Sequence, residues 1–325
     1  MIVLITGGAG YIGSHTAKFM SKAGHQPVVL DNLSLGHKYA VKWGPLERGD
    51  LADADFVSGV FTRHKIDAVV HFAANACVGE SMTNPRKYFR NNSVNTLNLL
   101  DAMVYAGVKE IVFSSTCATY GDPLRVPIDE AHPQHPVNPY GESKFFVERV
   151  LHWYAGAYGI RYAALRYFNA AGTDPDGEIG EDHTPETHLI PLVIEAALGK
   201  RPHIGIFGTD YPTPDGTAIR DYIHVNDLAD AHIRALAHLK KRGANLALNL
   251  GTGKGNSVRE VIAAVEAVSG RIVPVEVGPR RPGDPAELVA DPRKARAILD
   301  WEPRYPDIRT IAEHAWKWHS ARISN

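Results

Sequence analysis

The fold of this chain follows from one stretch near its start, Thr6-Gly7-Gly8-Ala9-Gly10-Tyr11-Ile12-Gly13, which joins an apolar run to a helical pattern. Its glycines satisfy G-x-G-x-x-G through Gly8, Gly10 and Gly13, and G-x-x-G-x-x-G through Gly7, Gly10 and Gly13. Between a strand and a helix, such glycines allow a tight turn, close approach of a pyrophosphate and close helix–strand packing. The helix N-terminus adds N–H donors and the positive end of a dipole. The stretch therefore predicts a dinucleotide-binding turn.

The next apolar run, Pro27–Asp31, ends in a carboxylate about 20 residues after the turn, where a ribose 2′-hydroxyl would be bound. No arginine follows it closely, because the sequence continues Asn32-Leu33-Ser34. A 2′-phosphate would therefore face an unpaired carboxylate. The pattern favours NAD over NADP.

Short β-branched runs alternate with helical patterns through the first half of the chain. The expected strands are Ile2–Thr6, Pro27–Asp31, Ala68–Phe72, Glu110–Ser115 and Arg161–Arg166. The expected helices are Tyr11–Ala23, Asp53–His64, Arg86–Ala106 and Pro139–Tyr158. This alternation predicts an α/β fold with a Rossmann-type, doubly wound parallel sheet.

The pattern changes after about Asn169. Ala170–Glu186 and Gly208–Gly216 are rich in loop-forming residues. Regular patterns return later, as a strand at Leu246–Leu250 and as helices at Tyr222–Lys241, Val258–Val268, Pro292–Leu299 and Asp307–His319. We expect an NAD-binding domain from residues 1–169 and about 217–250, and a smaller C-terminal α/β substrate-binding domain from 170–216 and 251–325.

Composition limits the class of partner. The chain has 35 Lys and Arg against 36 Asp and Glu, a net charge of −1, which gives no general attraction to nucleic acid or anionic membranes. Only two cysteines are present, Cys77 and Cys117, so a disulfide framework is excluded. No signal peptide or membrane-spanning stretch is recognisable. We expect a cytoplasmic enzyme.

A second motif suggests catalysis. Tyr140 and Lys144 form Y-x-x-x-K on an expected helix, with Asn138 as its N-cap and Pro139 at its first position. The i,i+4 spacing places both side chains on one face. A neighbouring ammonium and a cationic nicotinamide would lower the pKa of the phenol, which is ordinarily about 10. The pair gains specificity beside a strand that ends at Thr116.

Further motifs identify a family. Those that resemble the extended short-chain dehydrogenase/reductase family are residues 6–15, Asp31-Asn32-Leu33, Gly49-Asp50-Leu51, His71-Phe72-Ala73-Ala74 and the Tyr140/Lys144 pair. Those that resemble its UDP-glucose 4-epimerase branch are Val78-Gly79-Glu80-Ser81, Leu165-Arg166-Tyr167-Phe168-Asn169, Gly216–Asp230 and Arg280-Arg281-Pro282-Gly283-Asp284. The likeness covers nearly the whole chain.

The resemblance implies inversion of the C4 hydroxyl of a UDP-hexose through a 4-keto intermediate, with NAD retained. Tyr140 would act as the base, Thr116 would bind the reacting oxygen, and Lys144 would bind the nicotinamide ribose. It also implies a homodimer.

The same resemblance assigns the remaining site residues. The implied cofactor contacts are Gly7, Gly10, Tyr11, Ile12, Gly13, Asp31, Asn32, Asp50, Leu51, Phe72, Ala73, Ala74, Asn91, Tyr140, Lys144 and Phe168. The implied substrate contacts are Thr116, Asn169, His188, Leu189, Phe207, Arg220, Tyr222, Arg281, Asp284 and Leu288. Two arginines suit a diphosphate, because a guanidinium forms paired, charge-assisted bonds with anionic oxygens.

The sequence departs from the family pattern at several positions. Ala76 replaces a lysine near the nicotinamide ribose, and His188 replaces a substrate-contacting asparagine. Leu288 lies where members restricted to plain hexoses carry a bulky aromatic residue and members that accept N-acetylhexosamines carry a small one. UDP-N-acetylhexosamine, or another UDP sugar, is therefore the alternative substrate.

Two other interpretations are less favoured. A nucleotide-sugar dehydratase needs an acidic dipeptide after the strand-end threonine, where this chain has Cys117-Ala118. A non-catalytic NAD sensor would be expected to lack the Tyr140/Lys144 pair. Cys117 is expected to be a small buried residue rather than a nucleophile. The spacing within Glu181–His188 matches no metal motif, so no metal site is expected.

Overall fold

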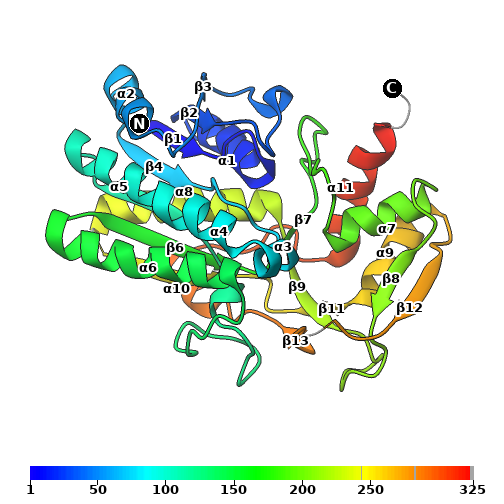
Figure 1. Cartoon of the computed structure of the whole chain (residues 1–325). Helices are drawn as coiled ribbons and strands as arrows, with labels where there is room; N and C mark the ends of the chain where they lie inside the picture. The colour runs from blue at the N-terminus through cyan, green and yellow to red at the C-terminus, as the bar shows by residue number, and fades with distance from the viewer. Residues whose placement is uncertain (243, 282, 323–325) are drawn as a thin grey trace.

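A seven-stranded parallel sheet forms the larger part of the molecule (Figure 1). The computed structural model describes residues 1–242, 244–281 and 283–322; Pro282, from one of the quoted motifs, lies outside them. In spatial order the strands are β3 (Leu46–Arg48), β2 (Gln26–Asp31), β1 (Ile2–Thr6), β4 (Ala68–His71), β5 (Glu110–Thr116), β6 (Arg161–Tyr167) and β10 (Leu246–Leu250). The expected Rossmann-type fold is confirmed. The strand order reverses between β1 and β4, which is the position where such sheets bind ligands.

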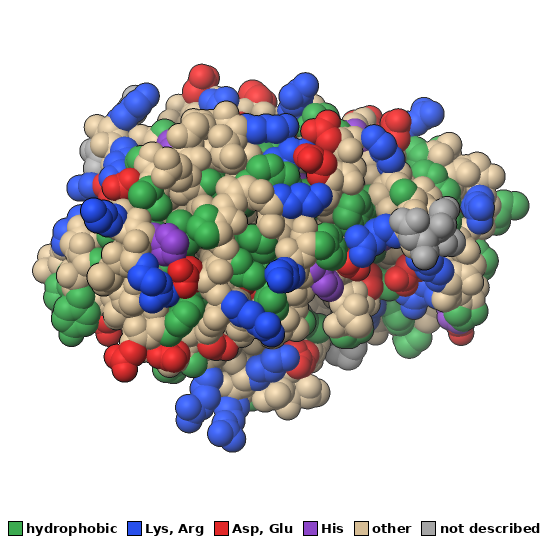
Figure 2. Space-filling view, turned by 90° about the horizontal axis from the view of Figure 1, so that it is seen from above, with side chains coloured by type: hydrophobic (Ala, Val, Ile, Leu, Met, Phe, Trp, Pro, Cys, Tyr) green, Lys and Arg blue, Asp and Glu red, His purple; other side chains and the backbone are tan. Residues whose placement is uncertain are grey.

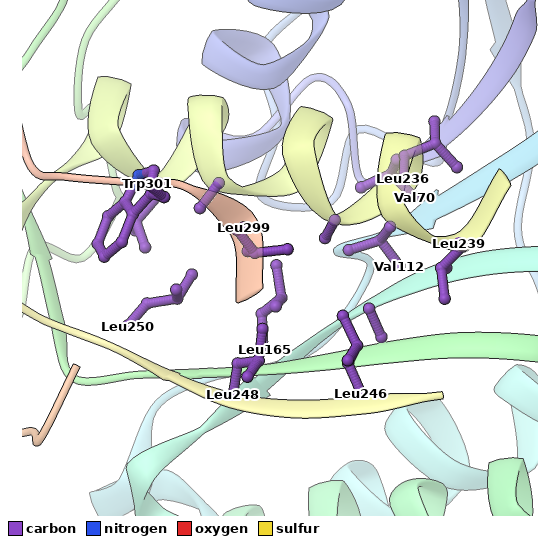
Figure 3. Close-up of a cluster of buried hydrophobic side chains, with 14 of the residues drawn as sticks. Val70, Val112, Leu165, Leu236, Leu239, Leu246, Leu248, Leu250, Leu299 and Trp301 are labelled. Atoms are coloured by element: carbon purple, nitrogen blue, oxygen red, sulfur yellow. The ribbon is translucent and has the colours of Figure 1, made fainter. Parts of the chain in front are cut away.

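Helices cover both faces of this sheet. One face packs against α1 (Tyr11–Lys22), α8 (Val225–Arg242) and α10 (Arg293–Leu299); the other packs against α2 (Ala54–His64), α5 (Asn95–Ala106) and α6 (Pro139–Tyr158). Each face has its own apolar core, and Figure 3 shows the first, where Leu236 and Leu239 of α8 lie over Leu165, Leu246 and Leu248. Burial on both faces explains the near-continuous apolar strands.

The helix expected at Arg86–Ala106 is not a single regular helix. It begins as α4 (Pro85–Tyr88), continues through a π-helical segment η2 (Phe89–Val94), and becomes α5. The short helix α3 (Val78–Thr83) precedes it. Single π-helical turns inside α-helices occur frequently at functional sites. This one faces the N-terminal part of α6.

The second half builds a smaller lobe. Its mixed sheet contains β7 (Asn169–Ala171), β9 (Ile219–His224), β11 (Gly255–Ser257) and β13 (Glu287–Leu288), and β8 (Ile204–Phe207) pairs separately with β12 (Val275–Gly278). The helices α7 (Leu189–Ala197), α9 (Val258–Ser269) and α11 (Ile308–Ala321) pack around a third apolar core. In Figure 1 this lobe lies on the right, beside the carboxyl ends of the large sheet.

One expectation for the second half is wrong, and one helix was not foreseen. Residues Tyr222–His224 belong to β9, and the helix expected from Tyr222 begins only at Val225. Leu189–Ala197 forms a helix that was not expected. The domain boundaries stay a prediction: α8 and β10 join the large sheet, but β9 pairs within the small one.

The surface carries both signs of charge. On the face shown in Figure 2, basic and acidic side chains are interspersed. Among the described residues, no helix combines the length and apolar character needed to cross a bilayer.

Candidate active site

The glycine turn has the geometry that its sequence predicts. Gly7 has a φ of 71°, and a Cβ there would lie 2.7 Å from the backbone nitrogen of Ala73. A Cβ on Gly13 would overlap the carbonyl oxygen of Gly7. Gly10 is the N-cap of α1, so the free N–H groups of that helix open where the strand order reverses.

Asp31 ends β2 beside this turn. Its carboxylate accepts hydrogen bonds from the backbone N–H of Ala9 (3.0 Å) and of Leu33 (2.8 Å). Burial raises the pKa of Asp31, although both hydrogen bonds lower it. Asn32 donates to the Asp50 carboxylate at 2.7 Å, which brings the segment after β3 to the same corner. Leu51 follows it, buried.

The ends of β4 and η2 complete this side. Phe72 and Ala73 donate their N–H groups to the Thr6 carbonyl at 2.9 and 3.1 Å, which places them beside the glycine turn. Ala74 follows, partly buried. Asn91 donates to Asn92, and Asn92 in turn binds Asn75 and Ser143. Two residues at the start of α1 are also predicted cofactor contacts. Ile12 packs on the core, and Tyr11 donates to the Gly172 carbonyl at 2.5 Å.

Thr116, Tyr140 and Lys144 meet at the carboxyl end of β5. The amide side chain of Asn138 accepts a hydrogen bond from the Gly141 N–H at 2.8 Å, so the predicted N-cap starts α6 there. The Thr116 hydroxyl accepts from the Ala118 N–H at 3.1 Å and lies near enough to the Tyr140 phenol to influence its pKa. The Lys144 ammonium donates to the Ser114 carbonyl at 2.8 Å and lies 4.9 Å from the centre of the Phe113 ring.

Burial dominates the electrostatics of this group. Burial raises the pKa of Tyr140 to about 12, although the Thr116 hydroxyl lowers it, and burial lowers the pKa of Lys144 to about 7. Without the cofactor, burial outweighs the other influences on both pKa values. The cause is desolvation, which disfavours the charged form of both groups.

A small cluster joins this end of β5 to the second lobe. Phe168 packs with Tyr120 and Ile128, and both Cys117 and Leu288 lie against them. Cys117 was expected to be buried but is only partly buried, and desolvation raises the pKa of its thiol to about 12. Leu288 pairs with Arg220 in the register of β13 and β9.

The other predicted substrate residues lie across from this cluster. The Arg220 guanidinium is held by the Asp284 carboxylate and by the carbonyls of Ile219 (2.7 Å) and Pro285 (2.8 Å). Arg281 is exposed, and its guanidinium lies 4.0 Å from the centre of the Phe207 ring. A groove of about 710 Å³ runs past Arg281, lined by residues 280–281 and 283–287 and by Asp122, Pro123, Val126 and Pro212.

Comparison with known proteins places the chain in a family. Residues 3–251 match the NAD dependent epimerase/dehydratase family. The chain belongs to this family. It is 54% identical to the UDP-glucose 4-epimerase of Halalkalibacterium halodurans over 319 residues, which are 98% of this chain and 96% of that protein. The match to the family and to this relative extends well beyond the glycine turn.

Two solved structures are close in shape. The UDP-glucose 4-epimerase of Brucella ovis in complex with NAD has a TM-score of 0.96 and 52% identity, and covers 97% of both chains. The UDP-Glc/GlcNAc 4-epimerase of Campylobacter jejuni has a TM-score of 0.87 and 45% identity, covering 98% of this chain and 99% of that one.

Three predicted substrate residues of this chain are more buried than Arg281. The Asn169 amide donates to the Asp221 carbonyl at 3.1 Å, and Tyr222 is buried in the third core. Leu189 is partly buried at the start of α7. His188, the N-cap residue before it, points to two glutamates instead: its Nδ1 is 2.8 Å from Glu181 and 3.1 Å from Glu186. Ala76 is exposed.

Sequence reasoning missed two buried charged groups that hold the site together. Asp221 accepts hydrogen bonds from Thr252, Gly253 and the Ala290 N–H, which ties β9 to the segment around Leu288. Glu148 of α6 accepts from Ser115 and from Arg166 of β6. Asp221 stands in the quoted Gly216–Asp230 motif and Arg166 in Leu165–Asn169, but neither motif pointed to these contacts, and Glu148 stands in no quoted motif.

Proposed function

We propose that this protein inverts the C4 hydroxyl of UDP-hexoses and so interconverts UDP-glucose and UDP-galactose. The observation that carries the proposal is the convergence of Thr116, Tyr140 and Lys144 at the end of β5, in a chain whose smaller lobe carries Arg220 and a groove lined by Arg281. Two relatives that are 54% and 53% identical to this chain are named UDP-glucose 4-epimerase, which supports the same activity.

The residues fit NAD. The cradle beside Gly7 and Gly13 has no room for a Cβ, and a helix N-terminus opens into it. Asp31 and Asp50 lie where the adenosine ribose would bind, and two carboxylates suit hydroxyl groups rather than a 2′-phosphate. Asn91, Phe72 and Phe168 would contact the rest of the NAD molecule. When bound, NAD supplies reversible hydride transfer.

Three side chains handle the proton. The Tyr140 phenol would take it from the sugar 4-hydroxyl and give it back, and Thr116 would hold the same oxygen. Lys144, protonated or neutral near pH 7, would share a hydrogen-bonded path with the phenol and the nicotinamide ribose. A phenol with its pKa near 12 needs a nearby positive charge to act as a base at neutral pH, and a cationic nicotinamide would provide one.

The groove would hold the UDP part. The Arg281 guanidinium is exposed and would bind the diphosphate. The Arg220 guanidinium is fixed by Asp284 and backbone carbonyls, so it would bind the diphosphate without changing its orientation. Asn169, Leu189, Phe207 and Tyr222 would surround the nucleotide and the sugar.

N-acetylhexosamines are the second candidate substrates. Leu288 packs beside Phe168 and Cys117, next to the strand end that carries Thr116. A leucine there leaves more room than an aromatic ring. The Campylobacter jejuni relative is named for both kinds of sugar.

We further propose a homodimer that acts in the cytoplasm. Phe146 and Trp153 are 42% and 70% exposed, and they lie seven residues apart on one face of α6. Tyr105 adds an aromatic side chain at the end of neighbouring α5. Exposed aromatic residues of this kind are enriched at protein interfaces. Sedimentation of the chain and of Trp153→Asp tests the dimer, because the variant should shift to the monomer.

The activity is tested by incubating the purified chain with UDP-galactose, without added nicotinamide, and separating the products. UDP-glucose should form to equilibrium, and no NADH should accumulate in proportion to it. Accumulation of NADH with an oxidised sugar would instead make the protein a dehydrogenase. Parallel reactions with UDP-N-acetylglucosamine test the second substrate.

A further inference from the structure

The loop before α7 brings together four side chains that can bind a metal. Glu181, His183, Glu186 and His188 each offer one ligand atom, and these four atoms all lie within 4.8 Å of one another. The two imidazoles present the same nitrogen to the carboxylates: Nδ1 of His183 and Nδ1 of His188 lie 3.3 and 2.8 Å from Oε1 of Glu181. Sequence spacing did not predict this, because an irregular loop, not a helix or a strand, forms the cluster.

Both carboxylates of the cluster are withdrawn from solvent. The side chains of Glu181 and Glu186 are 3% and 7% exposed. Within the described part of the chain, all ion pairs recorded for these two carboxylates come from His183 and His188, with no lysine or arginine among them. Buried carboxylates require a compensating positive charge.

One oxygen at the centre of the cluster has no hydrogen bond. Oε1 of Glu181 is buried and accepts none from the described residues, although both imidazole nitrogens lie at contact distance. The Nδ1 atom of His183 is equally without a hydrogen bond. Nδ1 of His188 does hydrogen-bond Oε1 of Glu186 at 3.1 Å, but the unsatisfied oxygen and nitrogen beside them are close enough to share one cation.

The surroundings hold these groups in place. Oε1 of Glu186 accepts hydrogen bonds from the backbone N–H groups of Thr187 (2.7 Å) and His188 (2.8 Å). The indole of Trp318 in α11 donates to the Glu181 carbonyl at 3.1 Å. The ring of Tyr11, at the start of α1, meets the His183 ring edge-on, with 6.0 Å between centres. Support of this kind orients metal ligands.

We propose that Glu181, His183, Glu186 and His188 bind one divalent transition-metal ion, with Zn²⁺ as the preferred ion. Two imidazoles and two carboxylates form a four-coordinate nitrogen and oxygen set that suits Zn²⁺. Two neutral imidazoles and two carboxylates carry a charge of −2, which a divalent ion balances. This inference is independent of the proposed activity.

The ion would have a positioning role. It would tie the loop to the first turn of α7, where Leu189 stands, and support Tyr11 at the start of α1 from the other side. It also accounts for His188: a histidine bound to metal is not available for the sugar contact that an asparagine makes in relatives.

A second acidic cluster provides the contrast. Asp174, Asp176 and Glu178 also lie close together, but the Lys18 ammonium lies among them at 2.7, 2.9 and 2.5 Å. A lysine already supplies the positive charge there. We expect no metal at this position, so it serves as a matched control.

The test is Zn²⁺ binding by the full, untagged chain after removal of metal with a chelator. We expect one Zn²⁺ per chain by calorimetry, with a rise in the unfolding temperature as Zn²⁺ is added. Loss of a direct ligand should weaken binding by at least the roughly 10- to 100-fold that loss of a supporting residue costs. His183→Asn and Glu186→Gln should both show this loss. The controls His203→Asn, an exposed histidine paired with Glu276, and Asp176→Asn should bind like the wild type.

A spectroscopic measurement on the wild type does not depend on the folding of any variant. Co²⁺ added to the metal-free chain should give the intense visible bands of a four-coordinate site, and Zn²⁺ should displace them. Absence of these bands together with no stoichiometric Zn²⁺ binding would overturn the proposal. Equal loss of binding in the two controls would place the ion elsewhere and overturn it as well.

Discussion

The two sides of the site are built in different ways. On the cofactor side, Gly7, Asp31 and Thr116 stand at the carboxyl ends of parallel strands of one sheet, so the sheet itself places them. On the nucleotide side, Arg220 and Asp284 meet only because short strands from distant parts of the chain pair in a mixed sheet. A site at strand ends needs little beyond the sheet, whereas the other side depends on long-range contacts.

The environments differ as well. Tyr140 and Lys144 are desolvated, and burial displaces both of their pKa values. Arg281 is exposed above Phe207 in an open groove. Chemistry benefits from a dry environment where electrostatic interactions are strong, while a charged ligand must enter through a hydrated one. Substitutions on the cofactor side should therefore reduce turnover, and those on the nucleotide side should reduce binding.

The largest effect is expected for Tyr140→Phe. Loss of the phenol removes the base but keeps the ring, so kcat should fall about 10²- to 10⁴-fold with little change in UDP affinity. Steady-state kinetics with UDP-galactose and calorimetry with UDP separate the two quantities. Tyr105→Phe, at a tyrosine that is 87% exposed, is the control. Turnover at the wild-type rate in Tyr140→Phe would remove Tyr140 from its role.

Arg281→Ala should act on binding. Loss of hydrogen bonds between charged groups costs about 1.5–3 kcal/mol, roughly a 10- to 150-fold weaker affinity for UDP. Calorimetry measures this directly, and Arg293→Ala, at an exposed arginine paired with Asp291, is the control. A large fall in kcat at unchanged UDP affinity would break the distinction between the two sides.

Leu288 lies where the two sides meet. Leu288→Tyr adds a ring in the space that an acetamido group would need, so the ratio of kcat/KM for UDP-N-acetylglucosamine over UDP-galactose should fall roughly tenfold. Leu288→Ala should raise that ratio. If neither substitution changes it, Leu288 contributes to packing alone.

The smallest effect concerns the stability of the protein without bound NAD or UDP sugar. Burial lowers the pKa of Lys144 from 10.5 to about 7. Between these two pH values the unfolded chain therefore binds more protons than the folded chain. The cost of burying the ammonium is therefore complete below about pH 7 and fades as the pH rises towards 10.5. Lys144→Met should raise the unfolding temperature by a few degrees at about pH 6.5 and by less at about pH 9.5.

Calorimetry at the two pH values checks this, with exposed Lys200→Met as the control. An equal gain at both would show that the ammonium carries no burial cost.

The sequence predicts the cofactor side well for a physical reason. Local signals, such as the glycine turn, the Asn138 cap and the apolar strands, are sufficient to order a parallel sheet and its helices. The π-helical segment at Phe89–Val94 was missed, because a single extra residue per turn leaves the apolar pattern almost unchanged.

The nucleotide side was harder to predict. In Tyr222–His224 the strand continues directly into α8, with no turn residue to mark the boundary, so helical periodicity was extended too far. The Glu181–His188 cluster and the contacts of Asp221 arise from tertiary contacts, and no local pattern encodes them.

The central claim is that a retained nicotinamide would take the C4 hydrogen as hydride and return it to the same carbon, while Tyr140 handles the proton of the 4-hydroxyl. Reaction of UDP-galactose that carries deuterium at C4, in ordinary water and without added NAD, tests it most directly. We predict that mass spectrometry and NMR will find the deuterium at C4 of the UDP-glucose formed. Replacement of that deuterium by solvent hydrogen would contradict the account.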